Sequence, residues 1–165
     1  MTKHHVTRFI CWAAIVAVPT SLFGQTSSDI SRAQAIQYAR AAEQNPLDPS
    51  ASEQRNQAMK FFENDHTSHV LLCQSIFNEF VGNKKDHAHD ISLQMLISAA
   101  AFLAEHPGSA QDSTKQNLAG VDAALNVYVK FLASDPKTQT HYLDDLLKKR
   151  DDGKLEQAIQ KSCKQ

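Results

Sequence analysis

A long apolar stretch in the middle of the chain, residues 91–104, constrains the fold more than any other feature. Wound into a helix, this stretch would be apolar on almost every side, and it stops just before the helix terminator His106-Pro107-Gly108. A helix that is apolar all round has to be covered on all sides by other elements. We therefore expect a central helix over about 86–105, surrounded by further helices.

The rest of the chain is also suited to helices. Only 5 Gly and 5 Pro interrupt the 165 residues, and no segment shows the alternating pattern of a strand. Proline, glycine and capping residues delimit the other expected helices, at about 29–44, 49–62, 70–82, 109–134, 138–150 and 154–164. The sequence thus predicts an all-α fold, a compact bundle of six to seven helices, with stacked helical hairpins as one possible arrangement.

The first 24 residues differ in character from those that follow. Lys3 and Arg8 give a basic start without acidic residues, 9–18 is an apolar run, and Gly24 is a small residue suited to a cleavage site. This plan is typical of a secretory signal peptide. The run of about ten residues is too short for a permanent membrane anchor, which needs roughly 20. We expect cleavage of 1–24, leaving 25–165 as a single all-helical domain that is periplasmic or secreted.

The charge of the remaining domain argues against nucleic acid as a partner. Loss of Lys3 and Arg8 leaves 15 basic residues against 18 acidic ones, a formal net charge of −3. Proteins that bind DNA or RNA usually carry a basic stripe or patch, and the sequence contains none. A protein or a peptide is the expected partner.

The cysteines predict one disulfide. Cys11 lies within the apolar run and would leave with the signal, so Cys73 and Cys163 remain as an even pair in an exported chain. Both fall on apolar faces of expected helices, so a bridge would join the last helix to the third. Two separate buried thiols are the alternative.

Four histidines in the middle of the chain are the candidate metal ligands. They occur as His66-x-x-His69 and His87-x-His89, and histidine nitrogen is a common ligand of zinc and copper. Both pairs also stand near expected helix starts, where polar residues often simply face water. The sequence leaves both interpretations open.

Three expected helix ends share a form in which a helix closes on a proline and another helix follows: 42–46, 104–107 and 133–136. In the C-terminal stretch, Tyr142, Gly153 and Ala158 have the spacing of an aromatic, a turn glycine and a small residue in a helix pair. These features resemble tetratricopeptide repeats. The resemblance implies helix hairpins stacked around a groove that binds a peptide or protein. Any helical bundle would also use Pro and Gly between helices, so a simple bundle stays open.

Motifs of catalysis are not found in the sequence. It has no Gly-x-Ser-x-Gly elbow, no phosphate-binding glycine loop and no His-Glu-x-x-His. The predicted function is therefore that of an exported helical module that binds a protein or peptide, without catalytic activity. The alternative is a periplasmic metal-binding or metal-dependent protein that uses the four histidines.

Overall fold

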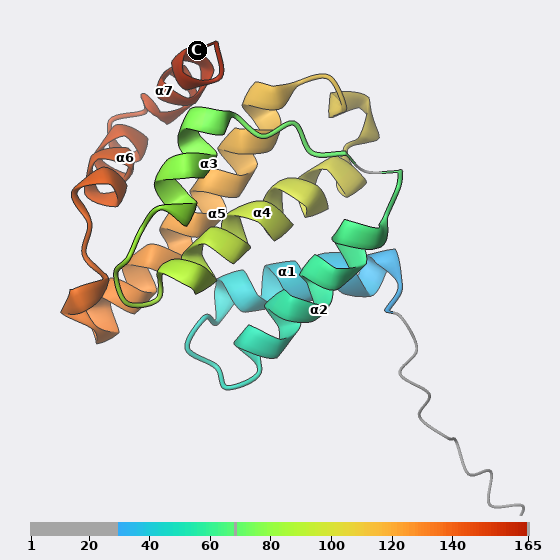
Figure 1. Ribbon diagram of the computed structural model, residues 1–165, viewed down its shortest axis with the longest axis horizontal. Helices are drawn as coiled ribbons and strands as arrows, with labels where there is room; N and C mark the ends of the chain where they lie inside the picture. The colour runs from blue at the N-terminus through green and yellow to red at the C-terminus, as the bar shows by residue number, and fades with distance from the viewer. Residues whose placement is uncertain (1–29, 68, 165) are drawn as a thin grey trace, which may run out of the picture.

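The computed structural model describes residues 30–67 and 69–164, and within them the chain is all-helical without strands (Figure 1). Short 3-10 turns, Pro107–Ser109 and Pro136–Thr138, precede α5 and α6. The α-helices are α1 (Arg32–Gln44), α2 (Ala51–Asn64), α3 (Gln74–Val81), α4 (Ala88–Glu105), α5 (Ser113–Ser134), α6 (His141–Asp151) and α7 (Leu155–Ser162). The all-α bundle of six to seven helices is confirmed. The expected signal peptide, 1–24, lies outside the described residues.

Helix α4 occupies the centre of the bundle, as its all-round apolar character predicts. It packs against α1 and α2 on one side and against α3 and α5 on the other (Figure 1). Ile91 and Met95 belong to a core cluster with α5, whereas Leu93 and Ile97 belong to a second cluster with α1 and α2. Two cores on opposite sides of one helix explain why almost every position of α4 is apolar.

Helices α4 and α5 approach each other closely at Gly120. A Cβ atom added at this glycine would lie 2.5 Å from the carbonyl oxygen of Met95 and 3.2 Å from the Cβ of Ala99. Such distances leave no room for a side chain without moving the α4 backbone. Gly120 therefore sets how near the two longest helices lie.

A buried charge joins α2, α4 and α5. Arg55 is only 1% exposed, and its Nη2 donates to Oδ1 of Asp90 at 2.9 Å. The guanidinium also lies over the ring of Phe131, 5.9 Å from its centroid. Loss of Asp90 would leave the buried cation without its carboxylate, which makes such pairs costly to break.

Several helices begin later than the sequence suggests, α2 and α5 among them. Pro49 was expected to open α2, but the Asp48 carboxylate accepts hydrogen bonds from the backbone N–H and hydroxyl of Ser50, at 2.8 and 2.6 Å. These bonds hold 48–50 in a turn, and the helix starts after it. The expected start of α5 at 109 is also wrong, because a 3-10 turn intervenes and Asp112 caps the helix.

No helix among the described residues is long and apolar enough to cross a membrane.

We predict that Gly120→Val destabilises the protein by about 1 to 3 kcal/mol, because the new side chain would push α4 and α5 apart. Urea denaturation followed by circular dichroism measures the change. Gly108→Ala is the control, because a Cβ there meets nothing within 4 Å, and it should change the stability by less than about 0.5 kcal/mol. Equal stability of the two variants would contradict the close approach of the helices.

Candidate functional sites

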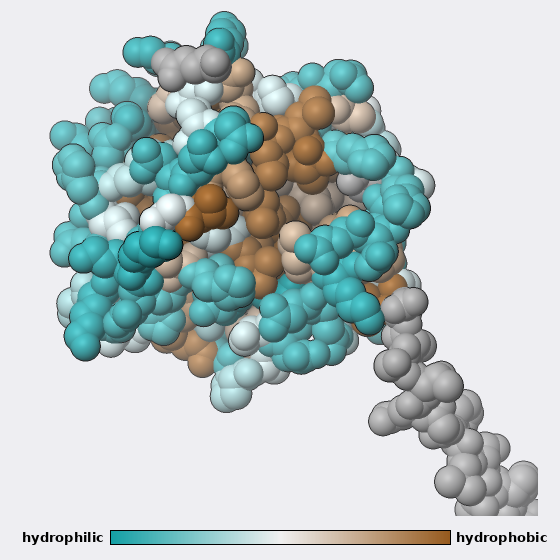
Figure 2. Space-filling view, viewed as in Figure 1, coloured by the Kyte–Doolittle hydropathy of each residue, from teal (hydrophilic) through white to brown (hydrophobic). Residues whose placement is uncertain are grey.

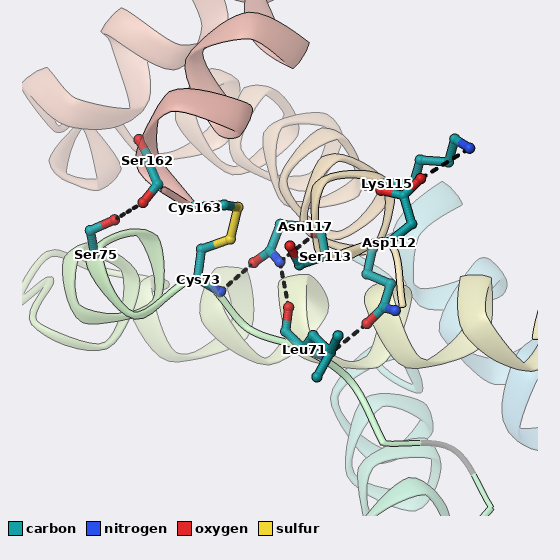
Figure 3. Close-up of a disulfide and its surroundings, with 10 residues drawn as sticks. Leu71, Cys73, Ser75, Asp112, Ser113, Lys115, Asn117, Ser162 and Cys163 are labelled. Carbon is teal, nitrogen blue, oxygen red and sulfur yellow. Dashed lines mark hydrogen bonds and ion pairs between the residues drawn. A yellow bond between two sulfur atoms is a disulfide. The ribbon is translucent and has the colours of Figure 1, made fainter. Parts of the chain in front are cut away.

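Cys73 and Cys163 form a disulfide that joins α3 to α7 (Figure 3). Their Cα atoms lie 4.8 Å apart, and the two residues cap the start of α3 and the end of α7. Beside the bridge, the hydroxyl of Ser75 donates to the carbonyl oxygen of Ser162 at 3.1 Å. The cysteine pair predicted from the sequence is thus found at disulfide distance, and it fixes α7 against the bundle.

The segment before α3, residues 69–73, is not helical, although residues 70–73 were expected to begin this helix. Asn117 holds it, since its Oδ1 accepts from the Cys73 N–H at 3.1 Å and its Nδ2 donates to the Leu71 carbonyl at 2.7 Å (Figure 3). Gln116 accepts from the Leu71 N–H at 2.7 Å. The buried side-chain amides of α5 thus form hydrogen bonds with backbone N–H and C=O groups that a helix over 70–73 would otherwise pair within itself.

The four candidate metal ligands lie on two separate parts of the structure. His66 and His69 follow the end of α2, whereas His87 and His89 stand at the start of α4. The start of α4 lies beside the first half of α2, where Arg55 contacts Asp90, and so at the opposite end of α2 from His66. Among residues 30–67 and 69–164, no group of three or more His, Cys, Asp or Glu is arranged to hold a metal ion. Zinc or copper binding stays a prediction from the sequence.

His87 packs against the end of α5. Its ring stacks on that of Phe131, with centroids 4.1 Å apart and planes at 6°, and its Nε2 lies 3.7 Å from a carboxylate oxygen of Asp135. The residue also has a left-handed backbone, with φ of 61°. These contacts fix the turn that leads into α4, where it meets the end of α5.

A groove of about 470 Å³ lies between α3, α6 and α7, and we call it the lysine groove. Ile76, Leu146 and Ile159 are almost fully buried and form its floor. Lysine side chains at its edges reach solvent: Lys149, Lys154 and Lys161. No Asp or Glu lines it. The disulfide at the end of α7 keeps its α3 wall and its α7 wall together.

Tyr128 of α5 holds the start of α6, which forms one wall of the lysine groove. The hydroxyl of Tyr128 donates to Asp144 at 2.6 Å and accepts from the N–H of Thr140 at 3.3 Å. Burial, and then the hydrogen bond to Asp144, raise the pKa of Tyr128 to about 12. Burial, and then the charge of Glu79, raise the pKa of Tyr142, which lines the groove, to about 12 as well.

One face of the molecule exposes apolar side chains. Figure 2 shows brown atoms gathered over α4 and the segment 69–73, between α3 and α2. We call this the apolar face and define it by five apolar residues of these elements: the exposed Leu71 and Val81, 40% and 47% accessible, and the half-buried Leu72, Phe77 and Leu96, which pack against the core cluster between α4 and α5. Leu96 was expected in the buried central helix, and the sequence did not indicate an open face.

Comparison of the chain with protein-family models, with curated proteins and with solved structures finds no match. The resemblance to tetratricopeptide repeats therefore stays a prediction, carried by the residues of the sequence alone. What the fold and the sites define is an all-α bundle with one disulfide, an apolar face and a lysine-edged groove.

Replacing both bridge cysteines, Cys73→Ala with Cys163→Ala, should lower the free energy of unfolding by about 2 to 5 kcal/mol. The expected loss is large because the bridge closes a loop across 90 residues, and opening it increases the entropy of the unfolded chain. Denaturation with and without a thiol reductant measures the effect. Non-reducing peptide mapping should recover residues 73 and 163 in one linked fragment; two free thiols in the exported protein would refute the pairing.

We predict that stability falls as the pH rises from about 10 to about 12. In this window the unfolded tyrosines lose protons near their ordinary pKa of 10.0, while folded Tyr128 and Tyr142 keep theirs. Below pH 10, where tyrosine is protonated in both states, the two tyrosines make their full contribution to the free energy of unfolding. Urea midpoints at several pH values up to 11 should decline more steeply for the wild type than for Tyr128→Phe. Parallel declines would show that Tyr128 does not contribute.

Proposed function

We propose that the chain, after loss of residues 1–24, is an exported helical module that binds a segment of another protein on its apolar face. The observation that carries this proposal is the gathering of apolar atoms on this side of the molecule in Figure 2, together with the exposure of Leu71 and Val81 on the elements that form it. Contiguous apolar surface on a soluble protein usually marks a site of interaction, because contact with water is unfavourable. The proposal assigns no reaction to the chain.

The arrangement of helices suggests how a partner segment would lie. The apolar face follows α4, with α3 along one side and α2 along the other (Figure 1). An amphipathic helix or an extended segment could rest over α4 with its apolar side chains on Leu72, Phe77 and Leu96. The segment 69–73 is held in place by Gln116 and Asn117, so this part of the face is formed before a partner arrives.

Export is supported by the cysteine pair as well as by the expected signal. Disulfides persist in oxidising compartments and are rare in the cytosol, so a pair at disulfide distance is compatible with a periplasmic or secreted protein. N-terminal sequencing of the protein recovered outside the cytosol tests this part of the proposal, and a first residue near Gln25 is expected.

The binding proposal predicts that Leu71→Lys with Val81→Lys abolishes capture of the partner. Both side chains are exposed, so the fold should survive, while two ammonium groups on the face would have to lose water on binding. Quantitative cross-linking of the exported chain to periplasmic or extracellular proteins should show at least a tenfold loss for the specific partner.

Leu47→Lys with Val129→Lys is the matched control, because these two exposed apolar residues lie in the α1–α2 turn and on α5, which are not among the elements that define the apolar face. It should capture the partner as the wild type does. Equal capture by all three proteins, or no reproducible partner for the wild type, would reject the proposal.

A further inference from the structure

We propose that the lysine groove is a separate binding site for an acidic peptide segment with one or two apolar side chains. This site lies between α3, α6 and α7, and it shares no defining residue with the apolar face. Binding at the lysine groove can therefore be tested independently of binding at the apolar face.

The lining of the groove supplies the apolar half of the recognition, over a floor of buried side chains. Ile76 comes from α3, Leu146 from α6 and Ile159 from α7, and all three are at most 4% exposed. A volume of about 470 Å³ lies within the range of pockets that hold small ligands or a few side chains, roughly 300 to 1,000 Å³. Above this floor, apolar side chains such as Leu or Phe in a peptide would contact the half-buried Tyr142 and Ala158 and the alkyl stems of the lysines.

The positive charge at the edges of the groove supplies the electrostatic half of the recognition. Three lysines and no carboxylate line this groove, although the whole chain has a formal net charge of −1. A second hollow, of about 410 Å³ between α4, α5 and the α6–α7 turn, balances Lys115 and Arg150 with Asp122 and Glu156. A third, of about 260 Å³ beside α3 and α6, has only the charge of Glu79. Of these three hollows, the lysine groove alone favours an anionic ligand.

The lysines are available to a ligand. Lys149 pairs with Asp145 at 2.5 Å and Lys154 with Asp152 at 3.8 Å, both on the surface of the same hairpin. Exposed pairs of this kind contribute only about 0 to 1 kcal/mol, so a peptide carboxylate can share or replace the partner. Lys161 forms no ion pair with the residues that the structure describes.

The disulfide keeps the walls of this site in place. Cys73 precedes Ile76 by less than one helical turn on α3, and Cys163 directly follows Ser162, a lining residue on α7. The bond between Ser75 and Ser162 adds a second link between the same two walls. A groove whose walls are already fixed loses little entropy when it binds a peptide.

The test uses the oxidised exported chain and two fluorescein-labelled peptides. One is a short peptide in which a Leu-Phe pair is flanked on both sides by Glu, and the other has Lys in place of Glu. Fluorescence anisotropy should show binding of the acidic peptide and at least tenfold weaker binding of the basic one. Added salt should weaken the acidic complex, because it screens the exposed charges. Lys154→Glu with Lys161→Glu should weaken the acidic peptide by at least tenfold.

Lys148→Glu with Lys164→Glu is the matched control, with the same change of charge on or next to the same two helices but outside the groove lining. It should retain binding within about threefold of the wild type. The four lysines changed in the two variants are all exposed: Lys148, Lys154, Lys161 and Lys164. Circular dichroism should therefore show that both variants fold. Absence of binding by the acidic peptide, equal binding of both peptides, or equal losses in the two variants would overturn the proposal.

Discussion

The burial of α4 on both sides is the constraint on which the rest of the bundle depends. Ile91 and Met95 give one cluster its contact with α5, and Leu93 and Ile97 give the other its contact with α1 and α2. Each such side chain contributes about 1.5 to 3 kcal/mol when it is fully buried. Because both clusters need the same helix, the α1–α2 hairpin and the helices from α5 onward are stabilised through α4 rather than through a broad contact of their own.

The fold could be predicted where local patterns determine the structure. Apolar spacing with Pro and Gly between segments gave the helices of the bundle, and the continuous apolar stretch identified the central one. The errors arose where distant side chains compete with the helix. No local pattern around Val70 shows that Asn117, more than forty residues later, will bind the backbone at 71–73. The late start of α2 was easier to predict from the sequence, because Asp48 and Ser50, which form the turn before it, are close together in the chain.

The candidate sites were predicted only in part, for a similar reason. The cysteines could be paired because two remain after Cys11 and both lie on apolar faces, which leaves one possible bridge. The histidines offered two short motifs, but sequence spacing does not determine whether two helix ends meet, and these lie at different ends of α2. The lysine groove combines α3 with the C-terminal hairpin. Nothing in the local sequence distinguishes its lysines from ordinary solvated charges, because the groove that they edge forms only on folding.

The position of the disulfide has a mechanical consequence. The sulfur bridge connects residue 73 directly to residue 163, so tension applied at the two ends of the chain would pass through the bridge and bypass the intervening helices. Among the residues that the structure describes, those outside the bridge, which include α1 and α2, are the ones that such a pull could extend. The load would act by shearing the α1–α2 hairpin off α4, while α4 and α5 stay inside a covalently closed loop. In the oxidised protein, the length that can be drawn out is therefore fixed by covalent chemistry and not by the strength of the core.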